Sequence, residues 1–320
     1  MAKRKNIEAD RLKKRDAWVE RTIRVTGYER SAAEKLLKTP RTQSFRLNPL
    51  VASATQGQIQ QDYAAKEIIW NGVTVGYTCE QNDMGRLRKS ESATNGEVYI
   101  QNAVSWLPVL ALDPKPDETI LDVCAAPGGK SSHIQVLTNN MSKLTCNDNS
   151  KPRLMKLQRN MERLGADATY TLCDATRLSR TFKPETFDKI LIDAPCSGEG
   201  LMTLDDLKLF DSWSVAHIRR LSDLQKKIVS ESWQLLKPGG TLVYSTCTMA
   251  PEENEAVIDY FLRRNPDAHL EVLDFPLENR IPALSLWNEK PFTNDLSPCF
   301  RLLPGKLAEA FFVTKITKQV

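Results

Sequence analysis

Two cysteines of this sequence each follow an apolar run. Cys196 stands in Leu191-Ile-Asp-Ala-Pro-Cys-Ser-Gly198, and Cys247 ends Leu242-Val-Tyr-Ser-Thr-Cys247. We predict that each run is a buried strand ended by turn residues, which places each thiol at the carboxyl end of its strand. In open parallel sheets this is the edge at which ligands bind. A thiol is the best neutral-pH nucleophile among ordinary side chains, so the pair indicates covalent chemistry.

A glycine-rich loop, Leu121-Asp-Val-Cys-Ala-Ala-Pro-Gly-Gly-Lys130, connects another predicted strand to a helix. Two glycines let a ligand approach the backbone closely, and the helix N-terminus beyond them presents free N–H groups. The loop lacks both the Gly-x-Gly-x-x-Gly fingerprint and the Walker spacing, which disfavours NAD and ATP. The cofactor-binding candidates in this loop are Cys124, Ala125, Ala126, Pro127, Gly128, Gly129 and Lys130.

Three acids follow successive predicted strands and should line the same edge of the sheet. Asp148 lies about 20 residues beyond the glycine loop, the spacing at which nucleotide-binding folds place an acid on a ribose. Asp174 could accept a hydrogen bond from an adenine amino group, and Asp193 precedes Cys196 by three residues. Each acid alone could instead be a helix N-cap. Together with Arg153, on the helix after Asp148, they predict a nucleoside-binding cleft.

Strands and helices alternate through most of the chain. Strands are expected at 119–125, 143–148, 169–173, 187–193 and 240–246, and helices at 130–137, 151–164, 217–236 and 252–264. Strands separated by single helices predict an α/β fold with a mostly parallel sheet. Residues 269–275 and 310–316 should form a strand pair at its edge.

The N-terminal part differs in character and charge. Residues 1–46 hold 14 Lys/Arg and 6 Asp/Glu, which leaves a net charge of −4 for the rest of a chain whose total is +4. We predict a basic helical arm over 1–40, a small α+β recognition module over 41–95 with a hairpin turning at Asn71-Gly72, and a catalytic domain over 96–320. A basic arm on a near-neutral body favours a polyanionic partner, although a solvated helix face would have the same composition.

Composition excludes several classes of protein. No apolar stretch approaches the roughly 20 residues that cross a bilayer, and no apolar segment follows the basic N-terminus as in a secretory signal. The seven cysteines are widely spaced, which argues against a zinc site, and a disulfide framework is not expected in the reducing cytoplasm. We therefore expect a cytoplasmic protein without a membrane segment or a metal.

The motifs in this order resemble the Sun/Nop-type family of RNA cytosine-5 methyltransferases. The resemblance rests on Asp122-x-Cys-Ala-Ala-Pro-Gly-Gly-Lys130, Asp193-Ala-Pro-Cys-Ser-Gly198 and Tyr244-Ser-Thr-Cys247. It extends to Phe45-Arg-x-Asn-Pro-Leu50, Gly96-x-x-Tyr-Ile-Gln101, Asn160-x-x-Arg-Leu-Gly165, Lys237-Pro-Gly-Gly240 and Glu253-Asn-Glu255, and spans roughly residues 44–317. It implies a class I methyltransferase Rossmann-like fold with a mostly parallel seven-stranded sheet.

The resemblance also implies a reaction and assigns roles. S-adenosylmethionine would be the cofactor, and C5 of a cytosine in rRNA or tRNA the methyl acceptor. Cys247 would be the nucleophile that adds to C6, and Cys196 would assist its release. Asp193 could stabilise the addition through N3 and the exocyclic amine of the base. Lys130 could act on the thiol, the base or the cofactor, and these remain open.

Two other functions are weighed against this one. A DNA cytosine-5 methyltransferase would take its nucleophile from the Pro-Cys motif, so Cys247 argues against it. A non-catalytic ribosome-assembly factor would be free to lose these side chains, and they are intact. The stretch Glu309-Ala-Phe-Phe312 departs from the family's usual Glu-Gly-Phe-Phe, which affects loop geometry near the base. We expect a monomer that recruits RNA through residues 1–95.

Overall fold

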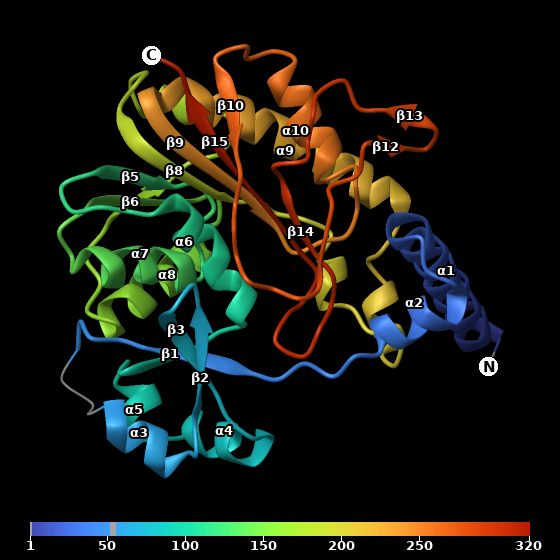
Figure 1. Cartoon of the computed structure of the whole chain (residues 1–320), viewed down its shortest axis with the longest axis horizontal. Coiled ribbons are helices and arrows are strands. Elements are labelled where there is room, and N and C mark those ends of the chain that lie inside the picture. The colour runs from blue at the N-terminus through green and yellow to red at the C-terminus, as the bar shows by residue number, and fades with distance from the viewer. Residues whose placement is uncertain (1, 52–55) are drawn as a thin grey trace.

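The computed structural model describes residues 2–51 and 56–320. The strands predicted from residue 119 onward lie in one twisted sheet (Figure 1). Its order is β11-β14-β15-β9-β8-β5-β6-β7, with β10 also paired to β15. The strands are β5 (Thr119–Asp122), β6 (Lys143–Asp148), β7 (Thr169–Leu172), β8 (Phe187–Asp193), β9 (Leu236–Thr246), β10 (Ala268–Glu271), β11 (Arg280–Ile281), β14 (Phe300–Leu302) and β15 (Phe311–Lys318). The predicted α/β fold with a mostly parallel sheet is confirmed, because β7, β6, β5, β8 and β9 run parallel.

The number of strands differs from the predicted seven. Within the described residues the sheet has nine, because two short strands share the position beyond β15. β14 pairs with the first part of β15 and β10 with its last part, while β11 extends the edge beyond β14. β15 itself runs antiparallel to β9. The predicted strand pair near the C-terminus is therefore present as β10 and β15.

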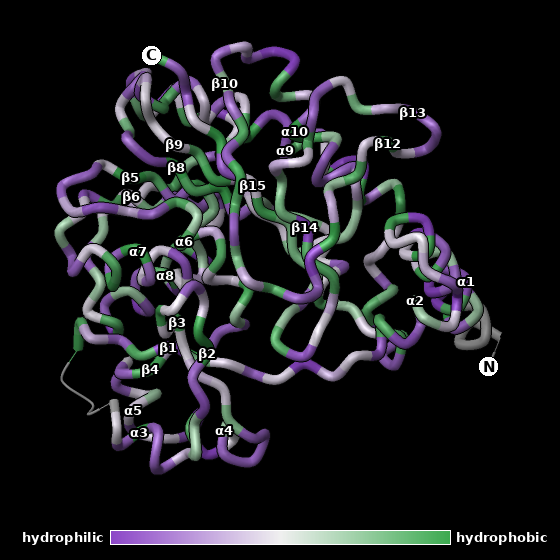
Figure 2. Tube along the Cα trace, in the orientation of Figure 1, coloured by the Kyte–Doolittle hydropathy of each residue, from purple (hydrophilic) through white to green (hydrophobic). Residues whose placement is uncertain are grey.

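Helices cover both faces of this sheet (Figure 1). α6 (Leu107–Leu112), α7 (Gly129–Thr138) and α8 (Lys151–Arg163) lie on one face, and α9 (Val215–Leu235) and α10 (Glu255–Leu262) on the other. Successive side chains of a strand point to opposite faces of the sheet, so one apolar run contributes to the cores on both faces. In β8, Leu191 packs in the first core, and Ile190 and Ile192 pack in the second. Figure 2 shows these strands as hydrophobic and the outer loops as mostly hydrophilic.

The N-terminal module has its own sheet, of order β2-β3-β1-β4. Its elements are β1 (Ser44–Leu47), α3 (Gln56–Asp62), β2 (Lys66–Trp70), β3 (Val73–Thr78), α4 (Gln81–Leu87), α5 (Glu91–Thr94) and β4 (Val98–Ile100). The hairpin turns at Asn71 and Gly72, whose φ angles of 50° and 76° fit the predicted type I′ turn. Because β4 pairs with β1, the sheet extends beyond residue 95, the predicted end of the module.

The helical arm packs against the catalytic part of the chain. It consists of α1 (Ala2–Thr26) and α2 (Arg30–Leu37), at the right of Figure 1. Trp18 of α1 meets Phe210 of η4 (Leu207–Phe210) edge to face, with ring centroids 5.5 Å apart. Met202 and Met249, which follow the two motif cysteines, belong to the same apolar cluster. The arm therefore supports the loops that carry the thiols.

The remaining elements are short. They are η1 (Ala103–Trp106), η2 (Leu178–Arg180), η3 (Glu199–Leu201), β12 (Leu286–Trp287) and β13 (Lys290–Pro291), and the last two form a separate hairpin. Among the residues that the structure describes, none of the helices is long and apolar enough to span a bilayer.

A buried ion pair joins β14 to α10. Arg301 and Glu255 have side-chain exposures of 1% and 0%, and Arg301 also donates to the carbonyl oxygen of Met249 at 2.9 Å. Replacing Arg301 by leucine strands the Glu255 carboxylate, so we expect the free energy of unfolding to fall by roughly 3–5 kcal/mol in urea titrations. Arg86→Leu, which removes the pair between an exposed arginine and the partly exposed Asp83, should cost about 1 kcal/mol or less. If the free energy of unfolding fell equally in the two variants, the buried ion pair would contribute no more to stability than an exposed one.

Candidate active site

The two motif cysteines meet at the carboxyl ends of neighbouring parallel strands. Cys247 directly follows β9, and Cys196 lies three residues beyond the end of β8. Their Sγ atoms are 3.3 Å apart, and both thiols are free. The hydrogen bond with Cys247, together with burial, raises the pKa of Cys196 well above its ordinary value. At neutral pH Cys196 is therefore a protonated thiol in contact with the other sulfur.

Asp193 and Lys130 lie beside the thiols as a second pair. Lys130 Nζ donates to Asp193 Oδ2 at 2.7 Å, and Ser245 Oγ donates to Asp193 Oδ1 at 2.9 Å. Burial lowers the pKa of Lys130, but the charge of Asp193 and this hydrogen bond outweigh burial and raise it. Lys130 is thus a cation that holds the Asp193 carboxylate in place, and the structure brings together all four residues that the sequence placed in catalysis.

Gly200, to which the sequence analysis assigned no role, lets the loops of Cys196 and Cys247 lie close to each other. Gly200 N donates to the carbonyl oxygen of Cys247 at 2.8 Å. A Cβ at this position would lie 2.2 Å from the carbonyl oxygen of Ala310 and 2.8 Å from that of Cys247. Any larger residue would push the loop of Cys196 away from Cys247. The short interval Gly198-Glu-Gly200 after the Pro-Cys motif is the only signal of this requirement in the sequence.

Buried carboxylates tie the same loops together. Glu253 accepts hydrogen bonds from the backbone N–H of Ser197 at 2.9 Å, from its hydroxyl group, and from Gln225 at 3.0 Å. Glu199 accepts from Trp213 Nε1 at 2.8 Å and from Thr248 at 3.2 Å. Burial raises the pKa of Glu253 to about 7. Residues directly after each cysteine are therefore anchored in the protein interior, which limits the movement of the thiols.

The predicted cofactor loop runs from β5 to the N-terminus of α7. Gly128 has a φ of 103°, which favours glycine, and a Cβ on Gly129 would lie 2.8 Å from Gln101 Nε2. Arg153 donates to the carbonyl oxygen of Ala126 at 2.9 Å, and Asn160 to that of Pro127 at 2.8 Å. The loop is thus held by two side chains of α8. The backbone N–H groups of the α7 N-terminus lie just beyond it, an arrangement that suits a ligand with an anionic group.

The three strand-end acids lie along one edge, because β8, β5, β6 and β7 are neighbours. Asp148 is buried, accepts from Ser150 N at 2.9 Å and lies 3.3 Å from Arg153. Asp174 is exposed, and its hydrogen bonds from the backbone and hydroxyl of Thr176 lower its pKa. Neither acid occupies a helix N-cap position, because Ser150 stands at that position of α8 and Arg177 at that of η2.

Asp122, in the glycine-loop motif, is a residue for which the sequence predicts no function. It is 1% exposed, and Ser131 Oγ donates to its Oδ2 at 2.6 Å while Oδ1 has no partner. Burial raises the pKa of Asp122 to about 7.

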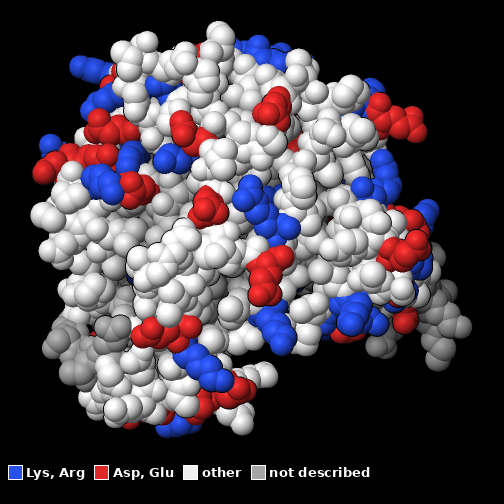
Figure 3. Space-filling model, viewed as in Figure 1, with Lys and Arg blue, Asp and Glu red and all other residues white. Residues whose placement is uncertain are grey.

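The basic arm makes many of its ionic contacts with the protein itself. Arg11 pairs with Asp211 at 2.7 Å, and Arg21 with Glu252 at 2.7 Å. The guanidinium of Arg24 lies 4.5 Å from the ring centroid of Trp287. In Figure 3 basic and acidic atoms are interleaved over α1 and α2. Some of the basic side chains that were predicted to bind a polyanion therefore hold the helical arm against the rest of the protein.

Glu309 is a buried carboxylate next to the site, on the segment before β15. It is 5% exposed and accepts from Asn102 Nδ2 at 3.3 Å. Burial raises the pKa of Glu309 to about 7, against the opposing charges of Lys130 and Arg41. The folded state therefore binds a proton that the unfolded state releases near pH 4.5, so this stabilisation is complete at low pH and is lost as the pH rises through 7.

We expect Glu309→Gln to abolish this loss. The variant should equal the parent protein in urea unfolding at pH 4 and exceed it at pH 8 by up to roughly 3 kcal/mol. Glu162→Gln, at an exposed position of α8, is the matched control, and because it retains Glu309 it should lose stability between pH 4 and pH 8 as the parent protein does. A constant difference between Glu309→Gln and the parent at both pH values would contradict the assignment.

Comparison with known proteins identifies the fold and the family of this chain. The fold, with its glycine loop and strand-end acids, is that of a class I Rossmann-like methyltransferase domain. A solved methyltransferase homolog protein from Pyrococcus horikoshii superposes on it with a TM-score of 0.74 and 28% sequence identity. The match covers 95% of this chain and 99% of that chain. The family model of the 16S rRNA methyltransferases RsmB/F matches residues 109–317. The chain belongs to this family, which confirms the resemblance to the Sun/Nop-type enzymes.

Two curated relatives show the range of the family. The chain is 36% identical over 299 residues to the probable ribosomal RNA small subunit methyltransferase B of Bacillus subtilis, covering 92% of this chain and 64% of the relative. It is 33% identical over 286 residues to the tRNA (cytosine(49)-C(5))-methyltransferase of Pyrococcus abyssi, covering 88% of this chain and 90% of the relative.

Proposed function

We propose that this protein is an RNA (cytosine-5)-methyltransferase that transfers the methyl group of S-adenosylmethionine to a cytosine in rRNA or tRNA. One observation carries the proposal: two free thiols 3.3 Å apart lie at the strand ends that also hold Asp193 and Lys130. Family membership supports it, as do the activities named for the two relatives. The chain would act as a cytoplasmic monomer.

The thiol pair suits the chemistry of cytosine C5, which is a poor nucleophile. In the proposed reaction the sulfur of Cys247 adds to C6 while its thiol proton passes to N3, so C5 gains enamine character. Asp193 would face N3 and the exocyclic amine, and Lys130 would hold its carboxylate in that orientation. A base within a duplex or stem would have to leave its stack to reach these groups.

Release of the product needs a proton on sulfur and the loss of one from C5. After methyl transfer, the C5 proton leaves, the C5=C6 double bond re-forms and the bond to Cys247 breaks. Cys196 is protonated at neutral pH and contacts the departing sulfur, so it can give that sulfur a proton and regain one from C5. Over the cycle Cys247 regains from Cys196 the proton that it gave to N3, Cys196 regains one from C5, and the proton on N3 passes to solvent. Both thiols return to their starting state, and one proton is released for each methyl group transferred.

The glycine loop fits the proposed cofactor, which supplies the methyl group. Gly128 and Gly129 keep the loop open at positions where a Cβ would meet other side chains. Asp148 would bind the ribose hydroxyls and Asp174 the adenine amino group, while Arg153 positions Asp148 and the loop backbone. The RNA would be recruited by residues 1–95, through basic side chains that are not paired within the arm, such as Lys13 and Lys35.

Methyl transfer from labelled S-adenosylmethionine tests the proposal. We expect label to enter total rRNA or tRNA and not duplex DNA, and bisulfite sequencing with and without the protein should identify one or a few 5-methylcytosines. Label in DNA alone would favour the DNA enzyme. Binding of RNA without any label would favour the assembly factor.

A further inference from the structure

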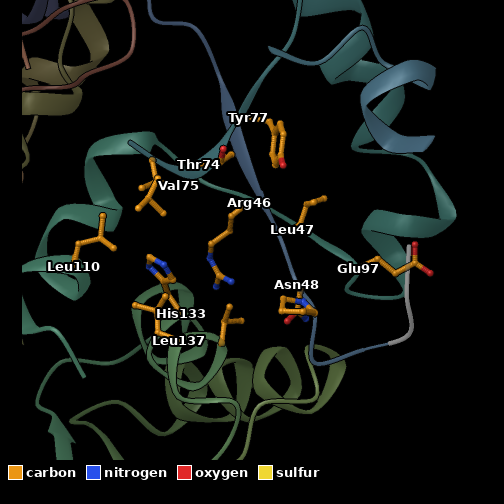
Figure 4. A pocket seen from close by; sticks show the side chains of 14 residues that line it. Arg46, Leu47, Asn48, Thr74, Val75, Tyr77, Glu97, Leu110, His133 and Leu137 are labelled. Carbon is orange, nitrogen blue, oxygen red and sulfur yellow. The ribbon is translucent and has the colours of Figure 1, made fainter. Parts of the chain in front are cut away.

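A cavity separate from the thiol site lies between the N-terminal module and α7 (Figure 4). Its volume is about 500 Å³, within the roughly 300–1,000 Å³ typical of small-molecule sites. The lining residues come from β1, β3, α6 and α7 and include neither motif cysteine, nor Asp193, nor Lys130. The cavity is therefore not part of the catalytic site.

A buried cation without a counterion points into this cavity. Arg46 is 2% exposed, and its Nη2 donates to the carbonyl oxygen of Gly129 at 3.2 Å and to Ser132 Oγ at 2.5 Å. Its Nε and Nη1 have no hydrogen-bond partner, and among the described residues no carboxylate forms an ion pair with it. Figure 4 shows the guanidinium extending from β1 into the space beside His133, with Glu97 directed away. A guanidinium stays charged in proteins, so a buried one without an anion is costly.

His133 adds a neutral polar group to the same space. It is 5% exposed, and its Nδ1 has no partner. Burial, and then the charge of Arg46, lower its pKa well below the ordinary value, so the ring is neutral at physiological pH. A neutral imidazole can donate one hydrogen bond to an anion held by Arg46.

Most of the remaining walls are apolar, although Asn48, Thr74 and Glu97 also line the cavity, which is open to solvent on one side. Val75, Leu110 and Val136 line the interior, and Val73 and Leu137 are 63% and 44% exposed. One positive charge in apolar surroundings matches a single negative charge on an apolar body. A dianionic phosphate would bring an uncompensated charge, and an RNA phosphodiester would bring polar sugars on both sides.

From the unpaired Arg46 guanidinium and the apolar walls around it, we infer that this cavity binds a small organic carboxylate. The carboxylate accepts hydrogen bonds from Nε or Nη1 of Arg46 and from His133, and its hydrocarbon part lies against Val75, Leu110 and Val136. Because Arg46 also binds the first turn of α7, an occupant would brace the module against the helix that begins at the glycine loop.

Ligand-observed NMR and calorimetric titration test this inference with three probes: sodium hexanoate, hexan-1-ol and inorganic phosphate. Hexanoate should bind saturably, and the other two at least about tenfold more weakly, since a hydrogen bond to a charged group contributes about 1.5–3 kcal/mol. Arg46→Gln should reduce hexanoate binding to the level of hexan-1-ol. Equal binding of hexanoate and hexan-1-ol would overturn the inference.

A second variant covers the case in which Arg46→Gln fails to fold. Leu137→Trp fills the mouth of the cavity without touching Arg46 and should abolish hexanoate binding. Met141→Trp, at a position 51% exposed that does not line the cavity, should leave binding unchanged. Undiminished binding to Leu137→Trp would place hexanoate elsewhere. Displacement of hexanoate by tRNA at micromolar concentration would assign the cavity to an RNA phosphate instead, and would also overturn the inference.

Discussion

Replacement of Cys247 by alanine is expected to lower the rate of methyl transfer to RNA by at least about a thousandfold, because C5 does not become a nucleophile without the thiolate adduct at C6. The measurement is incorporation of labelled methyl groups into rRNA or tRNA under single-turnover conditions. Affinity for S-adenosylmethionine should stay within about twofold, since Cys247 is absent from the glycine loop that we assign to the cofactor.

The control for this variant is Cys79→Ala. Cys79 is a buried thiol of the N-terminal module, packed in the cluster with Phe45 and Tyr77. Its loss tests whether removal of any thiol impairs the protein, and methyl transfer should remain close to that of the parent. Full activity in Cys247→Ala would remove the proposed nucleophile from the reaction.

Replacement of Cys196 by alanine is expected to block a later step than the loss of Cys247 does, because the covalent adduct should form and then fail to break down. Turnover should fall by at least about a hundredfold while a covalent protein–RNA complex accumulates, visible as a slowly migrating band on a denaturing gel. The physical reason is the 3.3 Å contact, through which Cys196 gives the departing sulfur its proton.

The double variant Cys196→Ala, Cys247→Ala gives the matched control, since it lacks the sulfur that would carry the RNA. It should show no band. A band in the double variant would place the bond on another residue, and the absence of a band in Cys196→Ala with normal turnover would remove Cys196 from the release step.

Much of the architecture could be predicted because it depends on local patterns. Apolar runs ended by Asp, Pro and Gly predict β5, β6, β8 and β9 within a few residues, and these strands alone bring Asp193, Cys196 and Cys247 to one edge. The register that sets Asp193 opposite Ser245 follows from parallel pairing of two such runs. The proposed catalytic residues can therefore be predicted from the sequence because they stand at strand ends.

Other features depend on contacts that no local pattern indicates. The two extra strands, β11 and β14, are two and three residues long and exist through pairing at the edge of β15. Gly200 is required only because the carbonyl of Ala310, more than a hundred residues away, lies against it. Composition likewise shows the positive charge of the arm but not that Arg21 is bound to Glu252.

The proposed mechanism depends on a covalent bond between the sulfur of Cys247 and C6 of the target cytosine. RNA transcribed with 5-fluorocytidine tests it most directly, because fluorine replaces the proton that must leave C5 and so blocks release after methyl transfer. The protein is incubated with this RNA and S-adenosylmethionine, digested with nuclease and protease, and the modified peptide is sequenced by mass spectrometry. We predict a methylated fluorocytidine adduct on the sulfur of Cys247. An adduct on Cys196, or none in an enzyme that methylates ordinary RNA, would contradict the account.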